Sequence, residues 1–374
     1  MDLGHGAAKG TIVSSARVWR FGVVGTGAMS ATMMECFALD SRAAVVAVAS
    51  ADPARARVFA AQFAIAHPCK DLAELLARAD IDAVYIATAT RDHAAHAIAA
   101  LEAGKAVLCE KPFAISAEQG MRVAAAAAGS GKLFVEAQWT PALPAYRELH
   151  RIARERALGD PVLLHSEFGI ALDPSSHARL FEGEGAGVLL DFGVYPIVLA
   201  LQLMGPVRSV QATLARNAAG VDIQASIQLA HVDGGHSQLA ASLVATLPNR
   251  TSLSCSRGLV ELDSPVMGAE SLRSRISAPA RAASPSTSSL GWKTRMVAAL
   301  RQQRWIRWLK ASLSGTASCT RPYGRNRYSP QLAHFVSLLD RGARASDLMP
   351  IETSLEVLRV VNAARLAASL VALG

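Results

Sequence analysis

Cysteine is scarce in this chain and forms no recognisable pattern. Five cysteines are spread over 374 residues, and no two of them form a Cys-x-x-Cys pair. An odd number of scattered cysteines argues against a disulfide framework, and the lack of paired cysteines argues against a zinc site. We therefore expect neither a structural disulfide nor a bound metal ion.

Long apolar runs and a cleavable leader are also missing. Although 51% of the residues are apolar, charged residues interrupt every stretch before it reaches the roughly 18 to 20 apolar residues of a membrane span. Residues 1–17 are rich in glycine and alanine and lack the apolar central region and cleavage site of a signal peptide. We interpret them as a flexible leader and expect a soluble, cytoplasmic protein.

Acidic residues are absent from one long segment. Residues 271–330 contain twelve Lys and Arg and no Asp or Glu, whereas the rest of the chain has 26 basic residues against 30 acidic ones. The formal net charge of +8 therefore comes from this segment and not from the whole protein. No recognised binding motif accompanies the charge, so we expect no nucleic-acid partner.

The surrounding residues, 265–330, are interpreted as a basic insertion that contains tryptophan. Residues 278–289 have the composition of a disordered linker, and residues 295–313 have helical spacing with basic side chains recurring every three residues. Two interpretations remain open. The insertion is either a solvated segment that contacts a partner subunit, or an anchor for an anionic surface such as a membrane leaflet, a charged glycan or a nucleotide-linked sugar.

The length of the chain suits two domains, and the first part alternates strand-like and helix-like segments. Strands that alternate with helices of about a dozen residues are typical of a doubly wound parallel sheet, so we expect an α/β Rossmann domain over residues 18–139. The predicted strands are residues 19–25, 43–49, 82–88, 106–110 and 132–136, and the predicted helices are residues 28–39, 92–103 and 117–128, with another that begins at Pro53.

A different pattern follows, and we expect a second domain over residues 140–374. Several segments alternate apolar and polar residues, which is typical of half-buried antiparallel strands. This predicts an α+β domain with an open, mainly antiparallel sheet. Its predicted strands are residues 207–216, 223–230, 238–246 and 251–256, and its predicted helices are residues 146–156 and 351–370.

The first predicted strand ends in a glycine-rich loop, GTGAMS, over residues 25–30. Gly25 permits a tight turn, and Gly27 lets the backbone approach a pyrophosphate at the N-terminus of the next helix. The loop follows a strand and opens a helix, which is the context in which this motif binds a dinucleotide. The residues expected to bind the cofactor here are Gly25, Thr26, Gly27, Ala28 and Met29.

The end of the second predicted strand distinguishes NAD from NADP. NAD sites usually place Asp or Glu there to bind the ribose 2′-hydroxyl, whereas NADP sites use Arg or small hydroxyl residues. Here Ser50 and Ala51 leave no carboxylate to repel a 2′-phosphate, and Arg55 is close enough in sequence to reach it. Asp52 is interpreted as a cap for the helix that follows. These residues favour NADP over NAD.

Lys111 stands in the sequence Glu-Lys-Pro at the C-terminal end of a predicted strand, which is the edge where open α/β sheets bind ligands. A lysine there can donate a hydrogen bond to a substrate hydroxyl, and a neighbouring cofactor charge can lower its pKa toward useful values. The alternative is a surface lysine with no chemical role.

Three motifs together resemble one known family. They are the glycine loop, IATATRDHAAHAIAALEAGKAVLCEKP over residues 86–112, and GVLLDFGVYP over residues 187–196. The chain resembles the glucose–fructose oxidoreductase and inositol dehydrogenase (Gfo/Idh/MocA) family over residues 18–262, and again at residues 347–352. Within the family it is most similar to the dihydrodiol and D-xylose dehydrogenase branch, which carries D-x-G-x-Y.

The resemblance implies roles for individual residues. Lys111 would anchor the nicotinamide and the substrate, and a cis bond would precede Pro112. Asp191 and Tyr195 would form the acid/base pair, and their spacing of four on a predicted helix puts both on one face. Thr88, Ala89, Thr90 and His93 would line the cofactor cleft, Glu110 would sit beside the nicotinamide, and Glu136 and Gln138 would close the far side.

The implied activity is hydride transfer between NAD(P) and a hydroxyl-bearing carbon of a sugar, an inositol or a related cyclic polyol. One alternative is an enzyme similar to trans-dihydrodiol dehydrogenase. Another is a catalytically silent relative that binds dinucleotide as a sensor or an assembly subunit. By analogy with the family, we expect a homo-oligomer formed through the open sheet.

Overall fold

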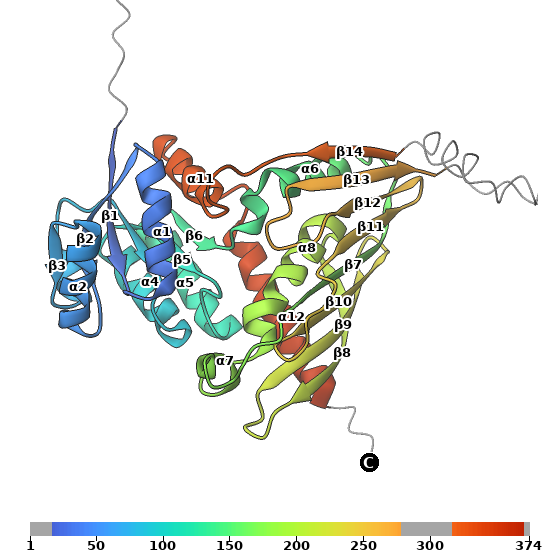
Figure 1. The fold of residues 1–374 in the computed structure, drawn as a ribbon, viewed down its shortest axis with the longest axis horizontal. Helices are drawn as coiled ribbons and strands as arrows, with labels where there is room; N and C mark the ends of the chain where they lie inside the picture. The colour runs from blue at the N-terminus through green and yellow to red at the C-terminus, as the bar shows by residue number, and fades with distance from the viewer. Residues whose placement is uncertain (1–16, 278–315, 370–374) are drawn as a thin grey trace, which may run out of the picture.

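The computed structural model describes residues 17–277 and 316–369, which form two sheets with helices between them (Figure 1). The expected leader up to residue 16, the linker at 278–289 and the helix at 295–313 lie outside the described residues. None of the described helices is long and apolar enough to cross a membrane.

The first sheet has six parallel strands in the order β3-β2-β1-β4-β5-β6, so the predicted doubly wound sheet is confirmed. The strand order reverses beside β1, where open α/β sheets bind ligands. The strands are β1 Trp19–Val24, β2 Ala43–Ala49, β3 His67–Cys69, β4 Ala83–Ile86, β5 Ala106–Glu110 and β6 Phe134–Ala137. The helices are α1 Ala28–Leu39, α2 Pro53–Phe63, α3 Leu72–Ala77, α4 His93–Glu102 and α5 Ala117–Ser130, with a 3-10 turn η1 Thr90–Asp92.

One helix from the C-terminal part of the chain packs on this first sheet. In α11 (Ser329–Asp340), Phe335 is fully buried and its ring lies 6.0 Å from that of Phe21 in β1. The indole of Trp19 donates a hydrogen bond of 2.8 Å to Asp340 at the end of the same helix. The chain therefore returns to the first sheet after the last strand of the second sheet.

The second sheet has eight strands in the order β14-β13-β12-β11-β7-β10-β9-β8. Only β7 and β10 pair in parallel, so the predicted open, mainly antiparallel sheet is confirmed. The strands are β7 Pro161–Gly169, β8 Val207–Arg216, β9 Asp222–His231, β10 His236–Ser242, β11 Thr251–Cys255, β12 Gly258–Leu262, β13 Ser271–Ile276 and β14 Thr316–Thr320.

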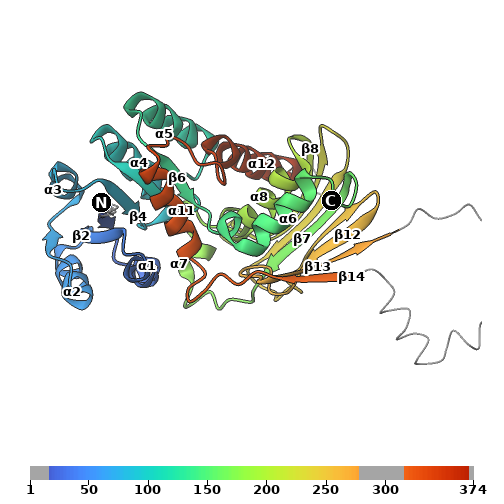
Figure 2. The same ribbon diagram turned by 90° about the horizontal axis from the view of Figure 1, so that it is seen from above.

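Helices cover one face of this second sheet, the face that looks toward the first sheet (Figure 2). They are α6 Pro144–Arg154, α8 Val194–Met204 and α12 Ile351–Ser369, together with the turns η2 Thr140–Ala142 and η3 Leu189–Gly193 and the short helix α7 Ala178–Phe181. No helix of the described residues lies on the opposite face. The helical layer therefore separates the two sheets and supplies side chains to the space between them.

Both ends of the segment interpreted as a basic insertion, residues 265–330, contain strands of the second sheet. Residues 271–276 form β13, which pairs with β12, and residues 316–320 form β14, which pairs with β13. Leu272 is the only buried residue of β13, because the strand lies near the edge of the sheet; its two Arg side chains and Ile276 are exposed, and its two Ser residues are half-buried. With one buried apolar residue, β13 lacks the alternation of apolar and polar residues that predicts a strand.

Candidate active site

A cleft of about 1000 Å³ lies between the C-terminal ends of the first sheet and the helical layer of the second. This position matches the ligand-binding crevice of open α/β sheets. Of the residues expected at the site, those that line the cleft are Gly25, Thr26, Gly27, Ala28, Met29, Ser50, Ala51, Thr88, Ala89, Thr90, His93, Glu110, Lys111, Pro112, Asp191 and Tyr195.

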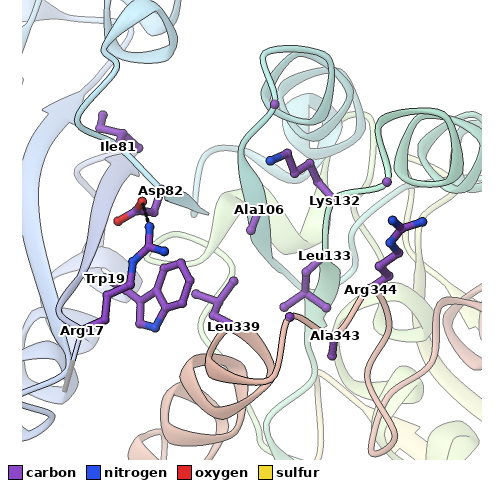
Figure 3. Close-up of a pocket in the computed structure, with 13 residues that line it drawn as sticks. Arg17, Trp19, Ile81, Asp82, Ala106, Lys132, Leu133, Leu339, Ala343 and Arg344 are labelled. Atoms are coloured by element: carbon purple, nitrogen blue, oxygen red, sulfur yellow. Dashed lines mark hydrogen bonds and ion pairs between the residues drawn. The ribbon is translucent and has the colours of Figure 1, made fainter. Parts of the chain in front are cut away.

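A smaller hollow of about 430 Å³ lies at the opposite edge of the first sheet. Trp19 at the start of β1 and Asp82 just before β4 line it, and Arg17 forms an ion pair with Asp82 there (Figure 3). Because this hollow is at the N-terminal ends of the strands, it is not the candidate site.

The glycine loop has the shape that a dinucleotide requires. Gly25 has φ +105°, and a Cβ there would lie 2.3 Å from the carbonyl oxygen of Ala87, so only glycine fits. Among the described residues, no atom lies within 4 Å of the Cβ position of Gly27, and no side chain caps helix α1, which begins at the next residue. The first amide groups of α1 therefore face open space, where a pyrophosphate can bind.

The ribose end of the cleft carries no carboxylate at the end of β2. Ser50 stands there, with its hydroxyl 3.2 Å from that of Thr26. Asp52 instead accepts a hydrogen bond of 2.8 Å from the amide of Ala54 and caps α2, as expected. Arg55 and Lys70 also line this end, and neither forms an ion pair with another described residue. Lys70, which follows the three-residue strand β3, was not expected at the site from the sequence.

Lys111 and Asp191 form an ion pair in the cleft. The ammonium of Lys111 lies 2.7 Å from a carboxylate oxygen of Asp191 and 2.7 Å from its carbonyl oxygen. Burial alone would lower the pKa of Lys111, but the negative charge of Asp191 and its hydrogen bond raise it above its ordinary value. This rise in pKa is opposite to the lowering that a cofactor charge would cause. Lys111 is therefore held here as a charged hydrogen-bond donor.

Asp191 is held in the complementary state. Burial alone would raise the pKa of its carboxyl, but the adjacent Lys111 ammonium lowers it below its usual range, and Arg179 adds to the effect. Arg179 lies in α7, lines the same cleft and was not anticipated from the sequence. Asp191 itself lies in a π-helical turn, η3, and not in the regular helix that the sequence predicted. Such turns often occur at functional sites.

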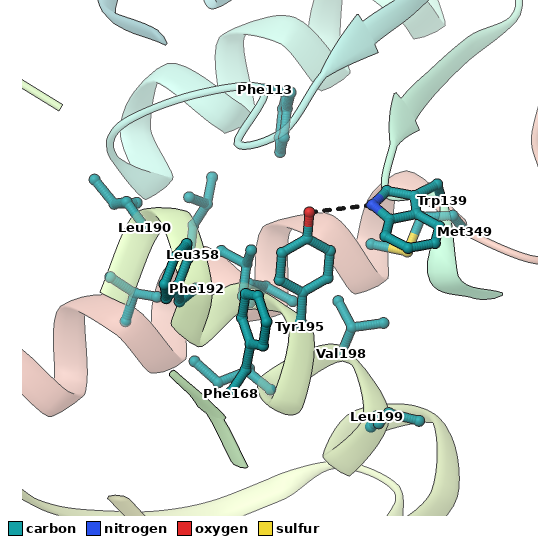
Figure 4. Close-up of a cluster of buried hydrophobic side chains, with 14 of the residues drawn as sticks. Phe113, Trp139, Phe168, Leu190, Phe192, Tyr195, Val198, Leu199, Met349 and Leu358 are labelled. Carbon is teal, nitrogen blue, oxygen red and sulfur yellow. Dashed lines mark hydrogen bonds between the residues drawn. The ribbon is translucent and has the colours of Figure 1, made fainter. Parts of the chain in front are cut away.

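Tyr195 is buried one turn further on, at the start of α8. Its hydroxyl oxygen accepts a hydrogen bond of 3.1 Å from the indole nitrogen of Trp139 (Figure 4). The ammonium of Lys111 lies 4.8 Å from the centre of the Tyr195 ring. Burial raises its pKa to about 12, although the charge of Lys111 opposes this rise. The phenol is therefore neutral, and its own proton has no acceptor among the described residues.

Glu110 is buried beside the pair and lines the cleft. Its carboxylate accepts a hydrogen bond of 2.7 Å from the hydroxyl of Tyr85 in β4. Burial raises its pKa to about 7, with partial opposition from the Tyr85 hydrogen bond and the Lys111 charge.

His93 connects two loops of the cleft. Its ring nitrogens lie 2.9 Å from the carbonyl oxygen of Pro112 and 3.2 Å from that of Thr88, and burial lowers its pKa. The bond between Lys111 and Pro112 is cis, as the resemblance implied. His93 thus braces the backbone around the Glu-Lys-Pro segment. His96, which was not anticipated, also lines the cleft and lies 3.1 Å from the hydroxyl of Thr88.

Glu136 and Gln138, which were expected to close the far side of the cleft, are not among the residues that line it. Glu136 is buried behind it and accepts a hydrogen bond of 3.1 Å from the amide of Phe113. The side-chain amide of Gln138 is buried without a partner among the described residues. Trp139, the next residue along the chain, lines the cleft instead and packs 4.8 Å from the ring of Tyr328.

Two family models match the chain. One, described as the GFO/IDH/MocA oxidoreductase family with an NAD-binding Rossmann fold, matches residues 19–138, and the other, described as the GFO/IDH/MocA C-terminal domain, matches residues 146–261.

Curated relatives carry the name of the branch that the sequence resembles. Trans-1,2-dihydrobenzene-1,2-diol dehydrogenase of Bos taurus is 33% identical over 250 residues, which are 66% of this chain and 74% of the relative. The Mus musculus enzyme of the same name is 31% identical over 247 residues, or 65% of this chain and 74% of the relative.

Solved structures share the fold. A levoglucosan dehydrogenase in complex with NADH and levoglucosan has a TM-score of 0.78 at 19% identity and covers 95% of this chain and 98% of its own. A 3-ketoreductase from Actinomadura kijaniata, solved with NADP, has a TM-score of 0.71 at 22% identity and covers 94% of this chain and 98% of its own. The resemblance found in the sequence is thus confirmed, and the chain belongs to the GFO/IDH/MocA family as an NAD(P)-dependent oxidoreductase.

Proposed function

We propose that the chain transfers hydride between NADP and a hydroxyl-bearing carbon of a sugar, an inositol or a related cyclic polyol, with Lys111, Asp191 and Tyr195 as the groups that handle the proton. The observation that carries this proposal is the position of the Lys111–Asp191 ion pair and the Tyr195 hydroxyl in the same cleft as the glycine loop.

Oxidation of a carbinol removes a hydride from carbon and a proton from oxygen. The bound nicotinamide ring supplies the chemistry for the hydride, which it accepts or returns. In the direction of carbonyl reduction, the hydroxyl of Tyr195 donates its proton to the substrate oxygen. The Lys111 ammonium and the Trp139 indole N–H then stabilise the phenolate that remains. In the direction of oxidation, this phenolate accepts the proton of the substrate hydroxyl.

Lys111 and Asp191 have separate tasks in this scheme. The ammonium of Lys111 donates to the substrate oxygen and lowers the energy of the negative charge that develops there. The carboxylate and carbonyl of Asp191 accept hydrogen bonds from two of the three N–H donors of the Lys111 ammonium. These two hydrogen bonds fix the direction of the third N–H, which is left for the substrate oxygen. Asp191 thereby keeps Lys111 charged and fixed in place.

The preference for NADP rests on the ribose end of the cleft. Ser50 leaves the end of β2 without a carboxylate, and Arg55 and Lys70 provide two cations that no described carboxylate neutralises. A 2′-phosphate carries the charge that complements these two side chains.

A trans-diol of an aromatic ring system is a second candidate substrate. It is favoured by the aromatic side chains beside Lys111, since Trp139, Tyr195 and Tyr328 line one wall of the cleft. The curated relatives named above are diol dehydrogenases, whereas the levoglucosan dehydrogenase was solved with an anhydrosugar.

The first experiment is a titration of the protein with NADPH and with NADH, followed by nicotinamide fluorescence. Turnover is then measured with sugars, inositols and trans-diols. We expect Lys111→Ala to retain dinucleotide binding and to lose turnover, whereas Lys132→Ala, an exposed lysine of the opposite hollow, retains both. Turnover that persists in Lys111→Ala contradicts the proposed role. Dinucleotide binding without turnover of any substrate favours a silent relative.

Two proposed contacts concern the surface. By analogy with the family, we propose a homo-oligomer formed through the helix-free face of the second sheet, and a molar mass in solution equal to one chain would contradict this. Contact with an anionic surface rests on the basic residues 271–330, most of which lie outside the described residues. Equal sedimentation with and without anionic vesicles would remove that proposal.

A further inference from the structure

A second ion pair lies behind η3, the turn that carries Asp191. Asp222, the first residue of β9, and Arg365 of α12 are joined by hydrogen bonds of 2.9 and 3.2 Å from the guanidinium to one carboxylate oxygen. The side chain of Asp222 is only 7% exposed. Neither residue lines the cleft. A buried carboxylate destabilises the fold unless it is paired with a cation and hydrogen-bonded. The other hydrogen-bond partners of this pair therefore show which backbone the carboxylate holds.

Two further hydrogen bonds of this pair reach the backbone that leads into η3. The other carboxylate oxygen of Asp222 accepts a hydrogen bond of 2.9 Å from the amide of Leu189, the first residue of the turn. The guanidinium of Arg365 donates to the carbonyl oxygen of Ala186 at 3.3 Å. The amide groups at the start of a helical turn have no partner within it, and a carboxylate satisfies one of them while also complementing the helix dipole.

Gly187 makes this approach possible. It has φ +118°, and a Cβ there would lie 2.7 and 2.8 Å from the two carboxylate oxygens of Asp222. The carboxylate therefore rests against the bare backbone of the loop, between Ala186 and Leu189. The carbonyl of Gly187 in turn accepts a hydrogen bond from the amide of Asp191 at 3.3 Å.

We propose that Asp222 and Arg365 are positioning residues, which hold the first turn of η3 and thereby set Asp191 against Lys111. Lys111 binds both the carbonyl and the carboxylate of Asp191, so a shift of this backbone displaces both acceptors at once. The inference rests on the proposed function, because it assigns its effect to the Lys111–Asp191 pair.

The test compares Asp222→Ala, Arg365→Gln and Arg365→Lys with the parent chain. We expect the first two to lower kcat at least tenfold and to leave the Kd for NADPH within twofold, because the glycine loop lies on the other sheet. Arg365→Lys should recover part of the loss, since a lysine can still pair with Asp222. The matched control is Arg42→Gln, which removes an ion pair with Asp40 and Asp340 far from η3.

Hydrogen exchange gives a readout that does not depend on turnover. We expect a peptide over residues 186–193 to exchange faster in Asp222→Ala than in the parent, and at the parental rate in Arg42→Gln. Parental exchange in this peptide, or a loss of kcat no larger than that of Arg42→Gln, would overturn the inference. If Asp191→Asn keeps full turnover while the exchange result holds, the proposed function fails and the positioning contact stands.

Discussion

The ammonium of Lys111 lies 2.7 Å from both the carboxylate and the carbonyl oxygen of Asp191, although the two residues are 80 positions apart in the chain. This contact joins the end of a strand in the first sheet to a π-helical turn of the second half of the chain. It fixes the position of η3 relative to the end of β5 in the candidate cofactor cleft.

Asp191→Asn should destabilise the protein most near neutral pH. The pKa of Asp191 is lowered in the folded state, so its ionisation stabilises the fold above the usual carboxyl pKa, and this contribution is lost as the pH falls through the lower value. Removing one charge of a buried pair costs on the order of 3 kcal/mol. Thermal melts between pH 3 and pH 7 should show that the Tm values of the parent and of Asp191→Asn converge at acid pH. A constant difference in Tm across this range would contradict the prediction.

Tyr195→Phe should abolish most turnover and leave cofactor binding intact. General acid–base groups typically contribute about 10²- to 10⁴-fold, and we expect kcat to fall within that range. Tyr146→Phe is the matched control, because its hydroxyl donates to the carbonyl of Val266 and does not line the cleft. Equal losses in the two variants would argue that Tyr195 has a packing role only.

Trp139→Phe should shift the pH dependence of turnover to higher pH. The indole N–H donates to the oxygen of Tyr195 and lowers its pKa, so its removal raises the pKa of the phenol further. In the direction of oxidation, the rising limb of the plot of kcat against pH should shift to higher pH. The value of kcat at pH 7 should therefore fall by about fivefold to tenfold. A lower kcat with an unmoved limb would rule out this hydrogen bond as the cause.

Arg55→Ala and Lys70→Ala should each weaken the binding of NADPH more than the binding of NADH. A charge-assisted contact with phosphate contributes about 1.5–3 kcal/mol, which corresponds to at least tenfold in Kd. The loss should shrink at high salt, because both side chains are exposed. Fluorescence titrations with the two cofactors measure the ratio directly. Equal weakening of NADPH and NADH would place these residues away from the 2′-phosphate.

Glu110→Gln should stabilise the protein more at pH 8 than at pH 5. Burial raises the pKa of Glu110 to about 7, so the folded state binds an extra proton between that value and the ordinary carboxyl pKa. Stability therefore falls as the pH rises through this interval, by on the order of 3 kcal/mol. The glutamine keeps an acceptor for Tyr85 without the charge. Parallel unfolding curves of parent and variant at the two pH values would contradict this.

Local sequence was sufficient to locate the first sheet and its loop. The boundaries of α1, β2 and β5 agree with the predicted ones. β2 is a continuous apolar segment, β5 is apolar up to its last residue, Glu110, and α1 begins directly after the glycine loop. Strand β3 was missed, since three residues that include Pro68 carry no periodic signal. In the second sheet, β8 was predicted at its observed bounds, whereas β7 and β12 were not predicted as strands.

The sequence by itself determined the Rossmann fold, the glycine loop and the motifs that contain Lys111, Asp191 and Tyr195, because these depend on short-range spacing of residue types. Only the tertiary structure decided which side chains meet. It turned Trp139, and not Gln138, into the cleft, and it brought Tyr328 and Arg179 from distant segments to the same cleft. It also placed Asp222 and Arg365 behind η3. Such contacts join residues far apart in the chain, and no local pattern encodes them.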